Sequence, residues 1–221
     1  MNLGYACINL TLSGNKKKIT TNRTMIKKTF LKKGLDYASF LSLLNCQDLI
    51  KILKWNVDNN INLFRLSSQF FPWASEYNLK DLKNYNQIVA TLFESGSFAK
   101  KHNLRLTAHP GPFNVLVSPN ETVVHNTIND LSIHGEMFDL LGLDRTPYNK
   151  INIHCNGVYG DKLSAMNRFC ENYQKLPISV QSRLTVENDD KPSMYSVKDL
   201  MYIHEKIGIP IVFDYHHHKF C

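Results

Sequence analysis

Short apolar runs of β type alternate six times with longer segments of helical character along this sequence. The β-type runs cover residues 3–10, 62–67, 104–109, 150–155, 183–188 and 210–215. Helices are expected near 36–59, 80–101, 120–142, 161–174 and 196–207. Such alternation is typical of parallel strands that are joined by crossover helices. The sequence therefore predicts an α/β fold, either an open doubly wound sheet or a (β/α) barrel.

The length of the chain bears on the choice between these folds. A complete eight-unit TIM barrel usually takes about 250 residues. This chain has 221 residues and stops directly after its sixth strand candidate. If the fold is a TIM (β/α) barrel, we expect it to be incomplete, with about six of eight βα units. No linker or composition break divides residues 1–221, so a single domain is expected.

Two of the helical segments have clear local signals. In 36–59, apolar side chains recur at intervals of three or four and predict one apolar face, made of Phe40, Leu43, Leu44, Ile50, Leu53 and Val57. The segment 120–142 follows a Ser-Pro pair, has Glu121 in its first turn and ends at Gly142. These are the usual start and stop signals of a helix.

The charge balance favours an anionic partner. The chain has 26 Lys and Arg against 19 Asp and Glu, a formal net charge of +7, which suits polyanions such as nucleic acid. Much of the excess lies in Gly14–Gly34, "GNKKKITTNRTMIKKTFLKKG". Two interpretations of this segment stay open: a solvated loop and helix start, or an arm that contacts phosphates.

The cysteines and the hydropathy indicate the compartment. Five widely spaced cysteines form no C-x-x-C pair and are typical of reduced thiols inside a cell. No apolar run approaches the roughly 20 residues of a membrane span, and no export signal begins the chain. We expect a soluble, intracellular monomer without a membrane partner.

The last four strand candidates finish on groups that can bind a metal ion. The first three end at His109, His154 and Glu187, and the last reaches Asp214 with His217 three residues further on. In α/β sheets and barrels, the carboxyl ends of the strands form the functional face. A lone histidine or carboxylate is more often structural, but several together predict a divalent metal site with mixed nitrogen and oxygen ligands.

The histidine run near the last strand candidate limits how many of its side chains can be ligands. If the last strand continues, its adjacent side chains point to opposite faces, so the three residues of the run His216–His218 cannot all bind one ion. His217 is the preferred ligand and His216 the second candidate.

In "AHPGPF", Pro110, Gly111 and Pro112 fix a tight loop that projects Phe113, either to stack on a base or to pack on the rim.

Six segments in order then resemble one known family. They are "LGYACINLTL" at the start, "FRLSSQFFPWAS" (64–75), "LTAHPGPFNVLVSP" (106–119), "INIHCNGVYGDK" (151–162), "LTVENDD" (184–190) and "IPIVFDYHHH" (209–218). Together they resemble the UV-damage endonuclease family across essentially the whole chain.

The resemblance implies a TIM-barrel DNA repair endonuclease. Such an enzyme cuts double-stranded DNA on the 5′ side of UV photoproducts and other distorting lesions, with a cluster of divalent metals, Mn²⁺ being expected and Mg²⁺ or Zn²⁺ alternatives. The implied metal ligands are His109, His154, Glu187, Asp214 and His217, of which Glu187, His109 and His154 are also assigned to catalysis. Lesion contacts fall to Tyr5, Asn9, Pro112 and Phe113, and phosphate contacts to Lys162, Arg65 and the basic arm.

The sequence departs from the family pattern in three places. Glu76 stands where the family has a histidine ligand, and it is expected to ligate as a carboxylate. Pro112 and Phe113 replace a glutamine and a tyrosine, so the aromatic ring stays but the amide is lost. Beyond the histidine run the family carries further lysine, histidine and glutamate ligands. Two alternatives remain: a sugar isomerase barrel of the xylose isomerase type, or an inactive DNA-binding remnant.

Overall fold

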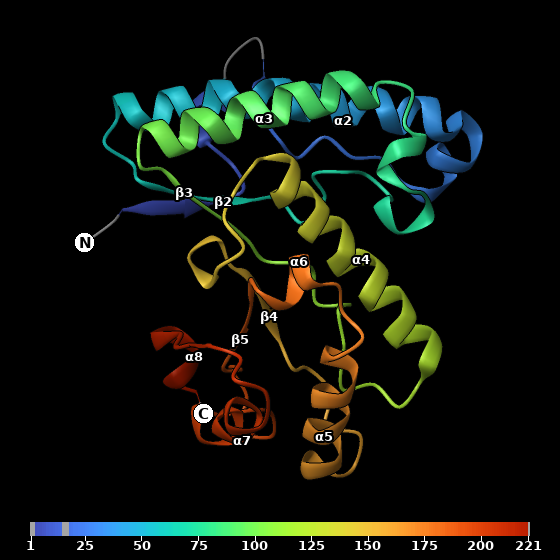
Figure 1. The fold of residues 1–221 in the computed structure, drawn as a ribbon, viewed down its shortest axis with the longest axis vertical. Helices are drawn as coiled ribbons and strands as arrows, with labels where there is room; N and C mark the ends of the chain where they lie inside the picture. Colours follow the sequence, from blue (N-terminus) through green and yellow to red (C-terminus); the bar gives the residue numbers. More distant parts are fainter. Residues whose placement is uncertain (1–2, 15–17, 221) are drawn as a thin grey trace. The chain divides into compact units, whose positions relative to one another are not determined.

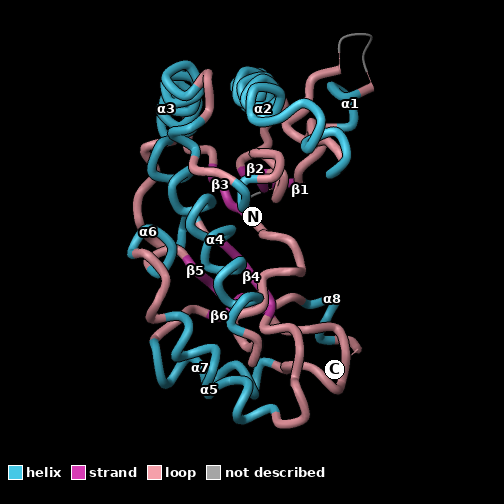
Figure 2. The backbone as a smooth tube through the Cα atoms, turned by 90° about the vertical axis from the view of Figure 1, so that its right-hand side faces the viewer, coloured by secondary structure: helices cyan, strands magenta, loops and turns pink. Residues whose placement is uncertain are grey.

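The computed structural model of this chain describes residues 3–14 and 18–220. Within them, each predicted β-type run contains a strand, shown in magenta in Figure 2: β1 (Gly4–Ala6), β2 (Leu63–Leu66), β3 (Arg105–Ala108), β4 (Ile151–His154), β5 (Leu184–Glu187) and β6 (Ile211–Val212). The order of the strands in the sheet follows their order in the chain. This parallel order with intervening helices confirms the predicted α/β fold with six βα units.

The helices alternate with these strands (Figure 1). They are α1 (Leu10–Ser13), α2 (Lys27–Asp58), α3 (Tyr85–Lys101), α4 (Glu121–Leu140), α5 (Lys162–Tyr173), α6 (Ile178–Gln181), α7 (Val197–Ile207) and α8 (Tyr215–His218). Single turns of 3₁₀ helix cover Ala74–Glu76, Leu79–Asp81 and Pro147–Asn149. The predicted helices correspond to α2, α3, α4, α5 and α7. The one-turn helices α1, α6 and α8 were not predicted, because four residues leave no apolar periodicity to detect.

The chain forms two compact units, residues 1–109 with 136–144 and residues 110–135 with 145–221. In the first unit, β1 pairs with β2 and β2 with β3, all in parallel. Phe64 and Leu106 are register partners and are fully buried. Helices α2 and α3 pack against each other and contribute the rest of this core.

The predicted apolar face of the first long helix is only partly correct, because Leu53 is buried and Leu43, Leu44, Ile50 and Val57 are half-buried, but the centre of the buried face lies elsewhere. Phe40 is 49% exposed, whereas Leu41, Leu49 and Ile52 are buried. The buried face also carries polar residues that hydrophobic periodicity cannot identify, namely Ser39, Ser42, Asn45, Asp48 and Asn56. Because these residues bond to neighbouring segments, for example Asn45 to the carbonyl of Phe70 at 2.9 Å, the face is set by tertiary hydrogen bonds as well as by apolar burial.

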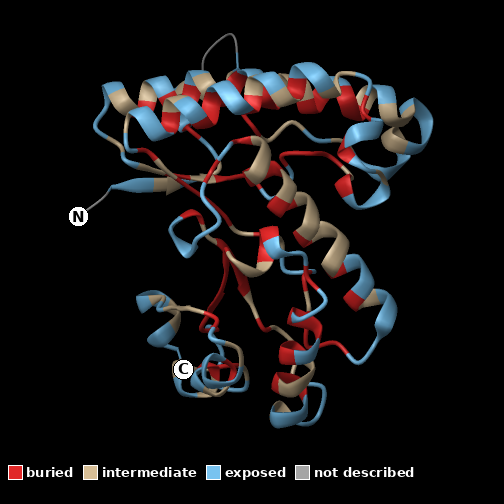
Figure 3. Cartoon of the chain, viewed as in Figure 1, coloured by how far each residue is buried: buried red, intermediate tan, exposed pale blue. Residues whose placement is uncertain are grey.

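In the second unit, β5 lies between β4 and β6, and all three are parallel. The strands β4 and β5 are buried along almost their whole length, as Figure 3 shows in red. The N-terminus of α7 is held by a capping box between Ser196 and Asp199, and Gly208, with φ of 70°, ends the helix in the left-handed conformation.

The last predicted strand is also wrong in its extent. It was expected over 210–215, but β6 ends at Val212 and the chain turns into the short helix α8. Asp214 caps this helix, since its side chain accepts hydrogen bonds from the backbone N–H groups of His216 and His217. The three histidines therefore follow helical geometry, and the argument from alternating strand faces does not apply to them.

Two further observations concern the hydropathy of the helices and the cysteines. Within residues 3–14 and 18–220, no helix is both long and apolar enough to cross a bilayer. Cys7, Cys46, Cys155 and Cys170 are free thiols, and Cys221 lies outside the described residues.

Candidate metal centre

Two carboxylates and an imidazole come together where β5 and β6 end. Candidate ligand atoms of Glu187, Asp214 and His217 all lie within 4.8 Å of one another. Glu187 is the last residue of β5 and pairs in register with Val212, the last residue of β6. Parallel strands that end at the same edge bring their following residues to one place, and the turn of α8 adds His217. Its Nδ1 lies 3.6 Å from Glu187 Oε1.

Glu187 is buried and held in position by neighbouring strands. It is only 6% exposed, and its Oε2 accepts a hydrogen bond from the side-chain amide of Asn152 on β4. The hydroxyl of Thr185 donates in turn to Asn152 Oδ1 at 2.7 Å. The charge of a carboxylate buried at this depth must be compensated by hydrogen bonds or a cation. The contacts with Asn152 and Thr185 provide part of that compensation and fix the orientation of Glu187.

The surroundings of the Asp214 carboxyl favour its charged form. Burial raises the pKa of its carboxyl, but hydrogen bonds from the backbone N–H of His217 and with Glu187, the N–H of His216 and the nearby imidazole outweigh this effect and hold the pKa below its usual value. The two N–H groups lie 2.7 Å and 2.9 Å from Oδ1. Asp214 is therefore charged at neutral pH, as a metal ligand must be.

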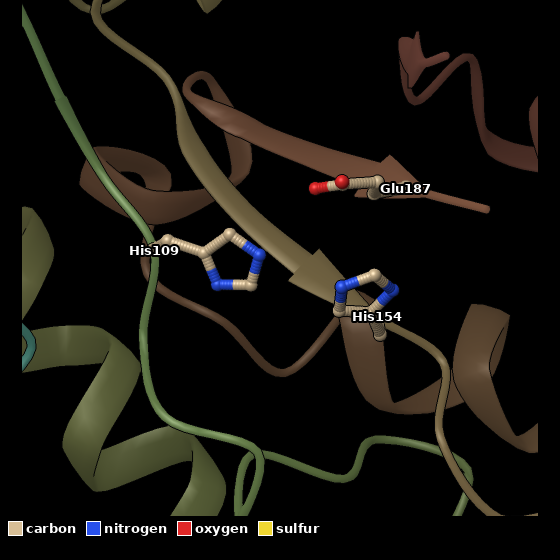
Figure 4. A group of neighbouring side chains, drawn as sticks. All are labelled: His109, His154 and Glu187. Carbon is tan, nitrogen blue, oxygen red and sulfur yellow. The ribbon is translucent and has the colours of Figure 1, made fainter. Parts of the chain in front are cut away.

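His154 lies beside Glu187 at the end of the neighbouring strand. The two are register partners, and Figure 4 shows both side chains at the ends of β4 and β5. The rings of His154 and His217 have centroids 5.3 Å apart. Burial lowers the pKa of His154, but the Asp189 carboxylate 3.4 Å from Nδ1, together with Glu187, raises it overall. The negative charge that raises this pKa would also attract a divalent cation.

Two other predicted ligands belong to the first unit. His109 follows β3 directly, on the segment drawn in Figure 4. It thus occupies the carboxyl end of its strand, as predicted. Glu76 ends the 3₁₀ helix Ala74–Glu76, and its side chain is exposed.

The predicted lesion-contacting residues have contrasting environments. Tyr5 lies in the middle of β1, and its hydroxyl donates to Asn56 at 2.7 Å and accepts from Asn9 at 2.8 Å. Asn9 is buried and caps α1, so it lies beyond the strand that was expected to contain it. Phe113, in contrast, is 88% exposed, and Pro112 beside it is exposed too.

The predicted phosphate contacts are mostly engaged within the protein. Lys162 Nζ donates to the carbonyl of Met194 at 2.6 Å and to Asp199 at 3.1 Å. Arg65 lies on β2, and its buried Nε has no hydrogen-bond partner among the described residues. In the basic arm, residues 15–17 lie outside the described residues, and Arg23 forms an ion pair with Asp48. The helix α2 begins at Lys27, so the helix-start interpretation of this segment holds for its second half.

The sequence analysis missed the residues that support the cluster. They are Asn152, Thr185, Asn188 and Asp189, all of which are buried. A signal for two of them existed: Asn152 and His154 lie two apart on β4, as do Thr185 and Glu187 on β5, and residues two apart on a strand share a face. Polar residues at this spacing beside a predicted ligand indicate partners that orient it.

The donor set fits a hard or borderline divalent cation. Carboxylate oxygens and imidazole nitrogens suit manganese, iron, zinc or magnesium, and no thiolate belongs to the group of Glu187, Asp214 and His217. Both carboxylates lie within reach of one ion, and the surrounding hydrogen bonds hold them in place. These residues therefore support the predicted divalent metal site without identifying the metal.

Comparison with known proteins relates the chain to one family. The family model of the UV-endonuclease UvdE matches residues 1–221. The UV-damage endonuclease of Schizosaccharomyces pombe is 38% identical over 220 residues, which cover 98% of this chain and 36% of that protein. The UV DNA damage endonuclease of Clostridium perfringens is 37% identical over 225 residues, which cover 100% of this chain and 50% of that protein. The chain thus spans about a third to a half of the length of these two relatives.

A solved structure extends the likeness to the fold. The crystal structure of SacUVDE superimposes with a TM-score of 0.88 at 32% identity, and the match covers 100% of this chain and 71% of that chain. Six parallel strands with intervening helices agree with an incomplete TIM barrel. The match of the family model over the full chain, together with these relatives, confirms the resemblance first suggested by the sequence segments, and the chain therefore belongs to the UV-endonuclease UvdE family.

Proposed function

We propose that this chain is a metal-dependent DNA repair endonuclease that hydrolyses the phosphodiester bond on the 5′ side of UV photoproducts and other distorting lesions. One observation carries the proposal: Glu187, Asp214 and His217 gather their ligand atoms within 4.8 Å at the strand ends of a UvdE family chain. Enzymes that cut phosphodiesters commonly use such clusters to hold divalent ions.

Glu187, Asp214 and His217 would hold the metal, with His154 and His109 as further ligands. The exposed carboxylate of Glu76 would substitute for a histidine. Mn²⁺ is the proposed ion, and Mg²⁺ or Zn²⁺ suits the same donors. A bound divalent cation supplies two effects here, since it lowers the pKa of a water molecule and stabilises negative charge on the phosphate oxygens.

The residues of the chain have separate tasks around this centre. Glu187 is oriented by Asn152, whose amide occupies Oε2, so Oε1 is the oxygen that faces His217. The carboxylate of Asp189 lies 3.4 Å from Nδ1 of His154, so its charge would favour a proton on that nitrogen. We assign Glu187, His109 and His154 to the catalytic set, because each lies at or directly after the end of a strand.

Recognition of the lesion would fall to aromatic and amide groups on the loops and first strand. Phe113 is 88% exposed and follows Pro112, which limits the loop backbone. An exposed ring can stack on an unstacked base, and a damaged base is easier to unstack than an intact pair. Tyr5 and Asn9, linked by a hydrogen bond of 2.8 Å, are proposed as a second contact with the lesion.

The DNA backbone would be held by exposed lysines at the start of α2. These N-terminal lysines of α2 are Lys27, Lys28, Lys32 and Lys33, all exposed. No acidic residue occurs between Gly14 and Asp36, so their charge is not balanced locally. The ring of Phe30 stacks on Trp73, whose indole N–H donates to the carbonyl of Met25 at 2.8 Å. The segment is thereby fixed to the fold, as a phosphate-contacting surface requires.

Arg65 and Lys162 are also proposed to contact phosphates, but with a smaller contribution than the exposed lysines of α2. A phosphate would have to compete with Asp199 for Lys162, because that lysine is already paired. Arg65 retains a guanidinium Nε without a hydrogen bond among the described residues. We therefore expect substitution of Lys162 to affect stability more than DNA binding.

A nicking assay tests the proposal. Irradiated and intact duplexes of one sequence, labelled at one end, are incubated with the chain and Mn²⁺, with and without EDTA, and the position of the cut is mapped. We expect cuts on the 5′ side of photoproducts that require metal, by a protein that elutes as a monomer. Equal cutting of both duplexes would contradict lesion recognition.

The other outcomes separate the alternatives. Tight Mn²⁺ binding with no cutting, and with turnover of a ketose or aldose instead, would favour the sugar isomerase. Binding of duplex without cutting at any metal concentration would favour a DNA-binding protein without nuclease activity. Both results would overturn the proposed function.

A further inference from the structure

One buried asparagine contacts two of the proposed metal ligands. Asn188 follows Glu187 at the end of β5 and is fully buried. Its side-chain Oδ1 accepts a hydrogen bond from the backbone N–H of Asp214 at 2.8 Å, and its Nδ2 donates to the carbonyl of Asp214 at 3.2 Å. Its own backbone carbonyl lies 2.9 Å from Nδ1 of His217. These three bonds join residues that are 26 and 29 positions apart.

The side chain of Asn188 forms hydrogen bonds to the backbone of Asp214 just beyond the last paired residues of β5 and β6. The pairing of β5 with β6 ends at Glu187 and Val212, and the chain then leaves the sheet to form α8. An amide side chain has one acceptor and one donor side by side, which match the N–H and carbonyl of Asp214. The two bonds also fix which atom of the amide is oxygen, because a backbone N–H can only donate.

The backbone carbonyl of the same residue determines the tautomer of His217. A carbonyl oxygen only accepts, so the bond of 2.9 Å requires a proton on Nδ1. The neutral imidazole then has its lone pair on Nε2, which becomes the nitrogen able to bind a metal. A histidine ligand is commonly oriented in this way by a carbonyl or carboxylate on its other nitrogen.

We infer that Asn188 is a positioning residue, which sets the place of Asp214 with its side chain and the metal-binding nitrogen of His217 with its carbonyl. This role rests on the proposed function, since it assumes that Asp214 and His217 bind a metal. Asparagine suits this place because aspartate could not donate to the carbonyl of Asp214, and an apolar residue would leave the N–H of Asp214 unpaired and its carbonyl with only the bond from the His218 N–H at 3.1 Å.

Calorimetric titration with Mn²⁺, in the absence of DNA, tests the role of the side chain. We expect Asn188→Ala to weaken Mn²⁺ binding about 10- to 100-fold, the usual effect of removing a partner that orients a ligand. Asn172→Ala is the matched control, because the buried Asn172 also donates to a backbone carbonyl, that of Leu116 at 2.8 Å, in the same unit. The control should lose comparable stability but keep the affinity for Mn²⁺.

Nitrogen-15 NMR of the imidazoles of the metal-free wild-type chain tests the carbonyl contact without any substitution. We expect His217 to have its proton on Nδ1, and the Asn188→Ala variant to show a mixture of tautomers because the backbone of Asp214, which begins α8, loses both bonds to the Asn188 side chain. A proton on Nε2 in the wild type would overturn the inference, whether or not the variant folds. So would equal Mn²⁺ affinity of Asn188→Ala and the wild type.

These results can be told apart from a failure of the proposed function. If the wild type binds no Mn²⁺ at all, the metal-dependent function fails and Asn188 has no ligand to position. If the wild type binds Mn²⁺ and the two Asn variants lose affinity equally, the function stands and only the role of Asn188 fails. Asn188→Asp provides an intermediate case, since it keeps one of the two bonds to Asp214.

Discussion

The candidate metal site, formed by Glu187, Asp214 and His217, and the loop that carries Phe113 differ sharply although both belong to the second unit. Glu187 is 6% exposed and its neighbours Asn152 and Asn188 are buried, so the cluster lies in a network of hydrogen bonds between strands. Phe113 is 88% exposed and follows Pro112, which is exposed as well.

This difference follows from what each region is proposed to do. Groups that hold a metal must keep their geometry before the substrate arrives, because misplaced charges weaken binding and catalysis. A ring that stacks on a base must be reachable and gains its contacts only from the partner. The ligand group is therefore preorganised by the fold, whereas under the proposed function the ring of Phe113 would gain its contacts only from bound DNA.

The largest expected effect is on the cluster. Glu187→Gln keeps the shape and an oxygen that can accept from Asn152 but removes the charge, so we expect nicking of irradiated duplex to fall by more than about 100-fold, beyond the effect of outer partners. Circular dichroism and melting of the variant should remain close to the wild type. Nicking within a few-fold of the wild type would show that Glu187 does not belong to the site. The contrast between a preorganised ligand group and an exposed loop would then lose its basis.

The loop should affect DNA binding without affecting the metal. Phe113→Ala removes a stacking ring worth about 1–3 kcal/mol per base, which corresponds to about 5- to 150-fold weaker binding of damaged duplex in fluorescence anisotropy. Phe113→Tyr is the matched control and should bind like the wild type. Mn²⁺ affinity should be unchanged in both, and a change in Phe113→Ala would show that the loop and cluster are not separate.

A smaller effect is expected from the N-terminal lysines of α2. Lys28→Gln with Lys32→Gln should reduce the slope of log K against log salt by about 1 for each lysine, equally for damaged and intact duplex. The control pair Lys54→Gln with Lys101→Gln changes charge by the same amount at other exposed positions. Equal slopes for the two double variants would assign the effect to net charge alone.

The smallest effect concerns the pH dependence of stability near α7. Burial raises the pKa of Asp199, but hydrogen bonds from Ser196 and contact with Lys162 lower it overall. Its contribution is therefore present at neutral pH and is lost as the pH falls below about 4 through the lowered pKa. Asp199→Asn keeps an oxygen that can accept from Ser196 but loses the ion pair with Lys162, so it should lose up to about 1 kcal/mol of stability at pH 7 and less at pH 3. Thermal melts would show this, with the exposed Glu205→Gln as control.

The sequence was sufficient for the local parts of the site. Strand runs that end on His154 and Glu187 could be recognised because both the β-type pattern and the ligand-type residue lie within a few positions. Asp214 and His217 were identified in the same way, even though their local structure was wrong. The expected strand over 210–215 failed because α8, a helix of one turn, has no periodicity, and its cap depends on the Asp214 side chain.

The sequence by itself determined the α/β class, the six strand positions and the residue types that could bind a metal, because these depend on short-range periodicity and on which side chains end each strand. Only the tertiary structure decided which face of α2 is buried, how Asn152 orients Glu187, and how Asn188 links Asp214 with His217. Those contacts join residues 26 to 35 positions apart. Their geometry arises from the pairing of neighbouring strands, which no local pattern of residues encodes.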